Sequence, residues 1–194
     1  MSFDALDLYG PTPPTSPDRP LVKRLIRRLG VQEATYVVIS PEAGCIEGDC
    51  FNNVTKLVGR YGGAMITGWC IWELPKLFAR AEHHAIWQRP NGLCVDPTPK
   101  DGAFCKILFI PDHNSPWDGP GHKAKRSIWQ ANQEKKDAWE LVRLETLRED
   151  LLEKKSLSKD NTELRKIDSK LAEVTKLLSD MDHLLYSKGL LKLR

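Results

Sequence analysis

Three side chains in the first half of the chain have the types that nucleophilic catalysis requires. Cys50 is expected in the first turn of a helix, where the positive end of the helix dipole and free backbone N–H groups favour thiolate over thiol. His84 is the candidate base and Asp96 the candidate carboxylate that orients its imidazole. In this arrangement Cys50 attacks and His84 takes its proton. The alternative is a buried Cys50 that packs as a small hydrophobic side chain.

The turn between His84 and Asp96 provides a geometric test of this arrangement. If residues 90–92, Pro-Asn-Gly, form a three-residue hairpin loop with a left-handed glycine, Arg89 pairs with Leu93. His84 and Asp96 then lie diagonally on one face of the sheet, within hydrogen-bond reach. A two-residue loop would put them on opposite faces. The turn chemistry therefore favours a Cys, His, Asp constellation.

Three further residues are candidates for supporting roles, and a fourth is a rival base. A side-chain amide, that of Asn53 by preference over Asn52, is expected to assist the backbone N–H of Cys50 in stabilising an oxyanion, with helix capping or a turn as its alternative role. Trp69 and Trp87 are expected to line a substrate groove, although aromatic side chains on strands commonly belong to the core. His83 points away from His84 and is the rival base.

Zinc binding is the main alternative chemistry, because six cysteine and histidine side chains could supply four ligands. No Cys-x-x-Cys or His-x-x-x-His pair is present to form a structural site, so we expect no metal and no cofactor. No glycine-rich phosphate loop precedes a helix either. The six potential ligands are Cys45, Cys50, His83, His84, Cys94 and Cys105.

The elements that must position these residues follow from hydrophobic periodicity and turn signals. Helices are predicted from Leu21 to a stop at Gly30, and from Cys50 to a stop at residues 62–63, both glycine. The β-branched and aromatic run at residues 35–39 predicts a strand. A helix followed by an antiparallel meander predicts an α+β fold. The four runs of that meander are residues 64–73, 82–87, 93–97 and 104–111.

The last part of the chain has the composition and periodicity of a helical hairpin. Apolar residues from Leu164 to Leu185 keep alternating steps of three and four, as in a coiled coil, and a looser seam runs from Leu141 to Leu151. Asp160, with Glu163 three residues later, has the spacing of a capping box for the second helix. We expect the hairpin to pack on the first domain, to form a homodimer, or to bind a partner protein.

Length, charge and composition bound the domain organisation and the class of protein. The 194 residues are 41% hydrophobic and 28% charged, with a net charge of +3, which fits a soluble globular protein. We divide the chain into a Pro-rich flexible arm (1–20), an α+β domain (21–122) and the helical hairpin (123–194). No apolar run is long enough to span a membrane, and no basic stripe interleaved with aromatics predicts nucleic-acid binding. Five cysteines at irregular spacings predict a reducing compartment, the cytoplasm.

Short motifs in the right order resemble a known superfamily. A cysteine opening a helix, then His84-Ala85-Ile86-Trp87, then Asp96-Pro97-Thr98, is similar to the transglutaminase-like superfamily of papain-like cysteine enzymes. Residues 50–54 (CFNNV), 68–73 (GWCIWE), 81–87 (AEHHAIW) and 107–112 (ILFIPD) resemble more narrowly a bacterial family whose members sometimes carry a SEC-C zinc tail. That tail is absent here, and a helical hairpin stands in its place.

The resemblance implies a papain-like or transglutaminase-like core and thiol chemistry on an amide. The expected function is a peptidase, deamidase or transamidase that forms a thioester on Cys50 and acts on a protein or peptide substrate. The alternative is a catalytically silent module that binds a partner protein through the hairpin.

Overall fold

The computed structural model describes residues 10–30, 33–100, 104–119 and 123–191. They form two compact units, which we describe separately. The sheet unit comprises Thr12–Glu73 and Ala79–Gln130, and the described residues of the hairpin unit are 10–11, 74–78 and 131–191. The division lies later than the expected one at 122, because residues 128–130 belong to a strand of the sheet unit. The predicted α+β class is confirmed.

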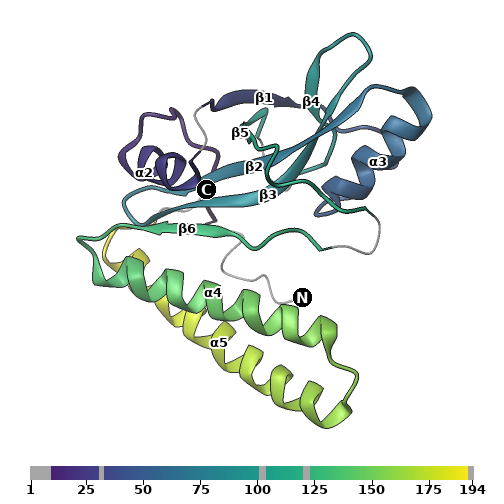
Figure 1. Cartoon of the computed structure of the whole chain (residues 1–194). Helices are drawn as coiled ribbons and strands as arrows, with labels where there is room; N and C mark the ends of the chain where they lie inside the picture. Colours follow the sequence, from purple (N-terminus) through teal and green to yellow (C-terminus); the bar gives the residue numbers. More distant parts are fainter. Residues whose placement is uncertain (1–9, 31–32, 101–103, 120–122, 192–194) are drawn as a thin grey trace. The chain divides into compact units, whose positions relative to one another are not determined.

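Five of the six described strands close into a barrel-like sheet. The order is β2-β5-β1-β4-β3-β6, and β2 also pairs with β3, so β6 is added outside the closed set (Figure 1). β1 is parallel to β4 and antiparallel to β5. The expected meander is therefore interrupted, because β1 inserts between β4 and β5. The strands are β1 (Thr35–Ile39), β2 (Ala64–Leu74), β3 (Phe78–Gln88), β4 (Cys94–Asp96), β5 (Lys106–Pro111) and β6 (Ile128–Ala131).

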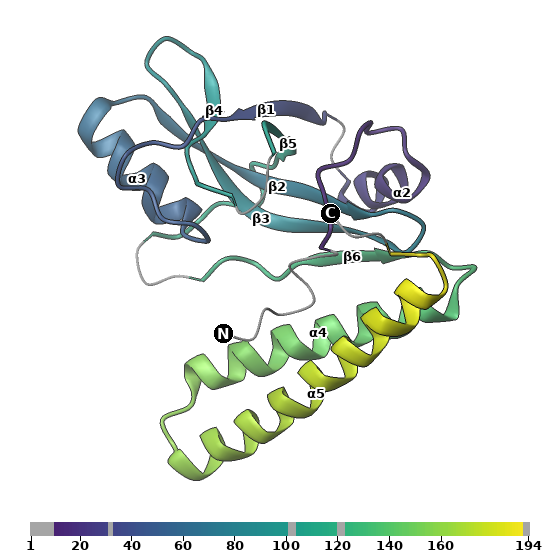
Figure 2. The ribbon, with the colours of Figure 1, turned by 180° about the vertical axis from the view of Figure 1, so that it is seen from behind.

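Alternate residues of these strands pack on two sides of the sheet. One buried cluster draws only on strands, with Cys70 and Trp72 of β2, Ile86 of β3 and Phe109 of β5 among its members, and it fills the inside. The outward residues are covered by two helices, α2 (Pro20–Leu29) and α3 (Cys50–Tyr61), which lie at opposite ends of the sheet (Figures 1 and 2). Both helices match the predicted ones.

Two glycines end α3 and let it approach β3 closely. Gly62 and Gly63 have φ angles of 77° and 86°, and a Cβ on Gly63 would lie 2.1 Å from the carbonyl oxygen of Gln88. The indole N–H of Trp87 donates to the carbonyl oxygen of Gly62 at 3.0 Å. Only glycine permits both the positive φ and this approach, so glycine at position 63 is what allows α3 to end so close to β3.

The Pro-rich segment is not a flexible arm over its described part, and this corrects the expectation. Thr12 forms a β-bridge with Glu73 through two backbone hydrogen bonds, and the side chain of Arg19 pairs with the same Glu73. Tyr36 donates its hydroxyl hydrogen to the carbonyl oxygen of Pro14. Proline lacks a donor but keeps its acceptor, so an extended Pro-rich segment can still pack on a sheet. The expectation for residues 1–9 lies outside the described residues.

The hairpin unit contains the two predicted helices. α4 (Lys136–Leu157) and α5 (Asn161–Ser187) lie side by side (Figures 1 and 2). The carboxylate of Asp160 caps α5 by accepting the N–H of Thr162, whereas Glu163 accepts from Ser158 rather than completing a capping box. In the part of the chain that the structure describes, no helix is long and apolar enough to cross a membrane.

Candidate active site

Cys50 is the first residue of α3, as the sequence predicts. Cys50 is 8% exposed, and it packs in the buried cluster between α3 and the outer face of β3 and β4. The preceding residue, Asp49, makes no side-chain cap to the helix, because its carboxylate instead accepts from the amide of Asn52 at 2.7 Å. The first N–H groups of a helix have no intrahelical partner, so α3 presents them beside the thiol. This position favours an anion at Cys50 or next to it.

The loop before Cys50 is fixed by Asn53, and this corrects the oxyanion assignment. Its Oδ1 accepts the N–H of Ile46 at 2.9 Å, and its Nδ2 donates to the carbonyl oxygen of Ile46 at 2.7 Å and to Thr98 Oγ1 at 3.2 Å. Both amide groups of this fully buried side chain are therefore engaged. Asn53 therefore fixes the loop before Cys50, and its amide has no donor left for an oxyanion.

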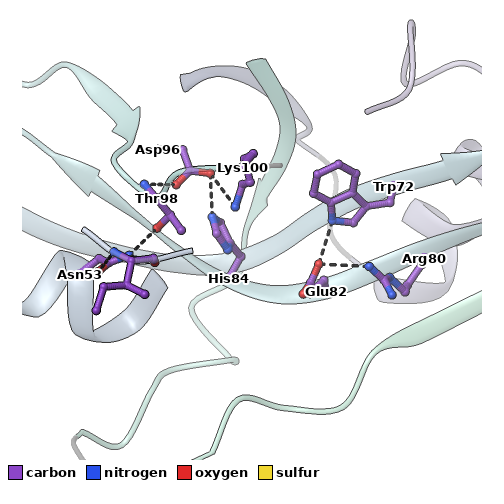
Figure 3. A network of polar contacts seen from close by, with 9 residues as sticks. Asn53, Trp72, Arg80, Glu82, His84, Asp96, Thr98 and Lys100 are labelled. Carbon is purple, nitrogen blue, oxygen red and sulfur yellow. Dashed lines mark hydrogen bonds and ion pairs between the residues drawn. The ribbon is translucent and has the colours of Figure 1, made fainter. Parts of the chain in front are cut away.

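His84 and Asp96 lie together in the register that the turn chemistry predicts. The N–H of Arg89 bonds to the carbonyl oxygen of Leu93 at 2.9 Å, and Trp87 pairs with Val95. Continuing this register places His84 and Asp96 on the inner face, where Nε2 of the histidine lies 3.0 Å from Oδ2 of the aspartate (Figure 3). The three-residue loop is thus confirmed, together with the contact that it predicts.

The thiol of Cys50 lies near His84, although Cys50 packs against the outer face of the sheet and His84 is on the inner face. β4 ends at Asp96, so the edge of β3 has no β4 partner at His84, and the start of α3 comes close there. The thiol of Cys50 is close enough to raise the pKa of His84, through hydrogen bonding and charge. Since Nε2 faces Asp96, Nδ1 is the ring nitrogen left for the sulfur. The order of contacts is therefore Cys50, His84, Asp96.

The surroundings of His84 favour its protonated form. Burial opposes protonation, but the charge of Asp96 and hydrogen bonds to Asp96 and Cys50 outweigh it and raise the pKa of His84 to about 9. A histidine that is charged at neutral pH beside a cysteine stabilises the thiolate, as in a thiolate–imidazolium pair.

Asp96 is kept as a carboxylate by several contacts. Its Oδ1 accepts the N–H of Thr98 at 3.0 Å, and its Oδ2 faces both His84 and the ammonium group of Lys100, the latter at 3.2 Å (Figure 3). Burial acts to raise the pKa of Asp96, but the charges and hydrogen bonds of His84, Lys100 and Thr98 prevail and lower it. A buried anion with this many partners can orient an imidazole without taking its proton.

His83, the rival base, has a different set of partners. Its Nδ1 accepts the backbone N–H of Lys125 at 3.0 Å, so its Nε2 carries the hydrogen that donates to the carbonyl oxygen of Ser115 at 2.8 Å. The ring lies between those of Phe51 and Trp69. Burial is the main cause that lowers the pKa of His83. Its contacts fix a loop rather than activate a nucleophile.

The two tryptophans that were expected to line a groove are buried. Trp69 is 4% exposed and donates its indole N–H to Asp112 at 2.8 Å, and Trp87 is 5% exposed and donates to Gly62. Both indole donors are satisfied inside the protein, which is typical of core residues. A more exposed aromatic ring beside α3 is that of the half-buried Trp117, which stacks on Phe51 with centroids 5.3 Å apart.

Sequence reasoning missed a second group of charged residues along the inner face of β3. Glu82 accepts the indole N–H of Trp72 at 2.9 Å and lies 3.4 Å from Arg80 (Figure 3). The alternation of residues 80, 82 and 84 could have indicated a shared face. Lys100 was missed because it lies in a loop, where no periodicity predicts the direction of a side chain.

No candidate metal centre is found among the described residues, where no three His, Cys, Asp or Glu side chains are placed to hold an ion. The five cysteines are all free thiols.

Comparisons of the chain with protein-family models, with curated proteins and with solved structures found no match.

Proposed function

We propose that this chain is a thiol-dependent enzyme, a hydrolase or acyl transferase acting on amides, with Cys50 as nucleophile and His84 as its acid and base. Asp96 orients the imidazole. The observation that carries the proposal is the buried His84, which is hydrogen-bonded to the carboxylate of Asp96 and whose pKa is raised by the thiol of Cys50 at the start of α3. Helix, sheet and register together fit a papain-like or transglutaminase-like core.

The proposed reaction follows from these positions. The thiolate of Cys50 attacks the carbonyl carbon of an amide, and the oxyanion that forms accepts from the first N–H groups of α3. The imidazolium of His84 gives its proton to the nitrogen as the carbon–nitrogen bond breaks, which releases the amine and leaves a thioester. Water or a second amine then attacks the thioester while His84 removes its proton, and the thiol is regenerated.

The proposed substrate is an amide of a protein or peptide, and this rests on the resemblance to the superfamily. Hydrolysis gives a peptidase or deamidase, and transfer to an amine gives a transamidase. Five free cysteines fit a reducing compartment, so we propose the cytoplasm as its location.

The test is formation of a thioester from an activated ester, p-nitrophenyl acetate, with the full chain. We expect a burst of p-nitrophenolate and an acetyl group on Cys50 in the intact-mass spectrum, and neither in Cys50→Ala or His84→Ala. Adding methylamine then distinguishes the two reactions, because transfer gives N-methylacetamide and hydrolysis gives acetate. Acetylation at the same rate in His84→Ala, or acetylation spread over all five cysteines, would refute the proposal.

A second candidate function, a protein-binding module, is favoured by the surface of the hairpin unit. Large apolar side chains on both helices are about half exposed, and such side chains on neighbouring helices are typical of contact surfaces. Sedimentation of the full chain over a concentration series tests homodimer formation, with Leu152→Glu/Leu177→Glu as the control. The side chains are Trp139, Leu152, Leu157, Leu177, Leu184 and Tyr186.

A further inference from the structure

Lys100 reaches back to the carboxylate that orients His84. Its Nζ lies 3.2 Å from Oδ2 of Asp96, the same oxygen that lies 3.0 Å from Nε2 of His84 (Figure 3). The Lys100 side chain is 14% exposed and that of Asp96 is fully buried. Water and salt therefore screen this contact less than they screen a surface ion pair.

We propose that Lys100 is a positioning residue of the candidate active site. It fixes the Asp96 carboxylate with Oδ2 facing His84, and its charge sets the pH at which His84 loses its proton. The consequence for catalysis rests on the proposed function, whereas the effect on the titration of His84 does not.

The geometry of the shared oxygen carries this inference. Because both cations contact Oδ2, the ammonium group and the imidazole lie within about 6 Å of each other, where like charges disfavour one another. Oδ1 is occupied by the N–H of Thr98, so the carboxylate cannot turn without losing that bond. Lys100 thus lowers the pKa of His84 below the value that Asp96 alone would produce.

Lys100 stays charged over the range in which His84 titrates. Burial acts to lower the pKa of Lys100, but Asp96 above all, with Cys70 and Glu82, raises it above its usual value. Other charged or titratable groups act on His84 or on its partners, and they are unchanged in a variant at position 100. They are Cys45 in the loop before α3, Cys50 of α3, Cys70 of β2, and Arg80, Glu82 and His83 of β3.

The experiment is a histidine NMR titration of the full chain in wild type, Lys100→Met and Lys100→Arg, with His84 assigned from His84→Gln. In Lys100→Met we expect the pKa of His84 to rise by about one unit, because a nearby cation is removed. Lys100→Arg keeps the charge and should stay close to wild type. Lys56→Met removes an exposed lysine of α3 and is the matched control.

A pKa of His84 that is the same in Lys100→Met as in Lys56→Met would overturn the proposal, whatever the melting temperature. If Lys100→Met does not fold, Lys100→Gln replaces it, with the same expected direction. The alkylation of Cys50 is followed in the same samples. A raised pKa of His84 in Lys100→Met together with an inert Cys50 would support the role of Lys100 and refute the proposed enzyme. A reactive Cys50 with an unchanged pKa of His84 would refute the role of Lys100 and support the proposed enzyme.

Discussion

Buried carboxylates occur in both units, and their surroundings differ. In the sheet unit, Asp96 has a backbone N–H, an imidazole and an ammonium group around it, and its pKa is lowered. In the hairpin unit, Asp182 is 4% exposed, and its Oδ2 has no hydrogen-bond partner among the described residues. Burial first, and then Glu145, raise the pKa of Asp182 to about 6. The first carboxylate is kept charged, and the second is easily protonated.

The two carboxylates differ in the number of polar partners that stabilise their charge. Three polar contacts converge on the carboxylate of Asp96, and two of its partners are themselves charged or chargeable. Such convergence is typical of active sites, where electrostatic arrangement serves the chemistry. In the hairpin, Glu145, which raises the pKa of Asp182, pairs with Arg148 at 2.8 Å, whereas Oδ2 of Asp182 has no hydrogen-bond partner among the described residues. This contrast supports the sheet unit as the place of the proposed chemistry.

The largest expected effect separates the two adjacent histidines. His84→Ala should slow acetylation of Cys50 by about 1,000-fold, because the thiol loses its base. His83→Ala should leave the rate within about threefold but destabilise the fold by about 2 kcal/mol, because it orphans the contacts of Ser115 and Lys125. Single-turnover kinetics and thermal unfolding measure the two quantities. Equal losses of rate in both variants would contradict the assignment.

Replacing the carboxylate should give the next largest effect. Asp96→Asn keeps the shape of the side chain but removes the charge that stabilises the imidazolium, so acetylation should slow by about 100-fold. The same substitution should lower the pKa of His84 in the NMR titration. A large drop in melting temperature with an unchanged rate would identify Asp96 as a purely structural residue.

The raised pKa of His84 predicts how the stability of the sheet unit depends on pH. The folded-state pKa, about 9, exceeds the unfolded one, so the stabilisation is fully present below about pH 6.5 and is lost as the pH rises through 9. The loss should be on the order of 3 kcal/mol. Urea unfolding from pH 6 to 10, followed by Trp fluorescence, measures it. His84→Gln, which cannot titrate, should flatten the profile, and an equally steep profile in that variant would contradict the coupling.

The hairpin unit should show a smaller dependence at lower pH. The pKa of Asp182 is raised to about 6, so the protonated form stabilises the fold below the unfolded value near 4, and this stabilisation is lost as the pH rises through 6. Asp182→Leu should therefore stabilise the hairpin by about 1 to 2 kcal/mol at pH 7.5. Hydrogen exchange of the α5 backbone amides measures this stabilisation, which should slow the exchange in the variant. Faster exchange in the variant would show that the carboxylate has a stabilising partner.

Local chemistry explains why much of the fold and site was predictable. Periodicity and glycine stops determine α2 and α3, and the turn at residues 90–92 determines the register that brings His84 to Asp96. Gly92 has a φ of 87°, as that loop requires. These features depend on residues close together in sequence, so the sequence alone reveals them.

The features that were missed depend on contacts between distant segments. Nothing local indicates that β1 inserts between β4 and β5, or that the short β6 extends the sheet. Pairing with Glu73 orders the Pro-rich segment, and Asn53 uses its amide on Ile46 instead of on an oxyanion. The burial of Trp69 and Trp87 likewise depends on helices packed against them. Composition and alternation could not have distinguished these outcomes.

The most direct test of the central claim is the pH dependence of iodoacetamide alkylation at Cys50, read by peptide mass spectrometry in wild type and His84→Ala. The account predicts that wild-type Cys50 reacts readily well below pH 8.5, the usual midpoint for a free thiol, and that His84→Ala abolishes this advantage. Cys105, which is exposed, is the internal control in the same digest. If Cys50 reacts like Cys105 at every pH, or keeps its advantage without His84, the thiolate–imidazolium pair does not exist and the proposed enzyme is refuted.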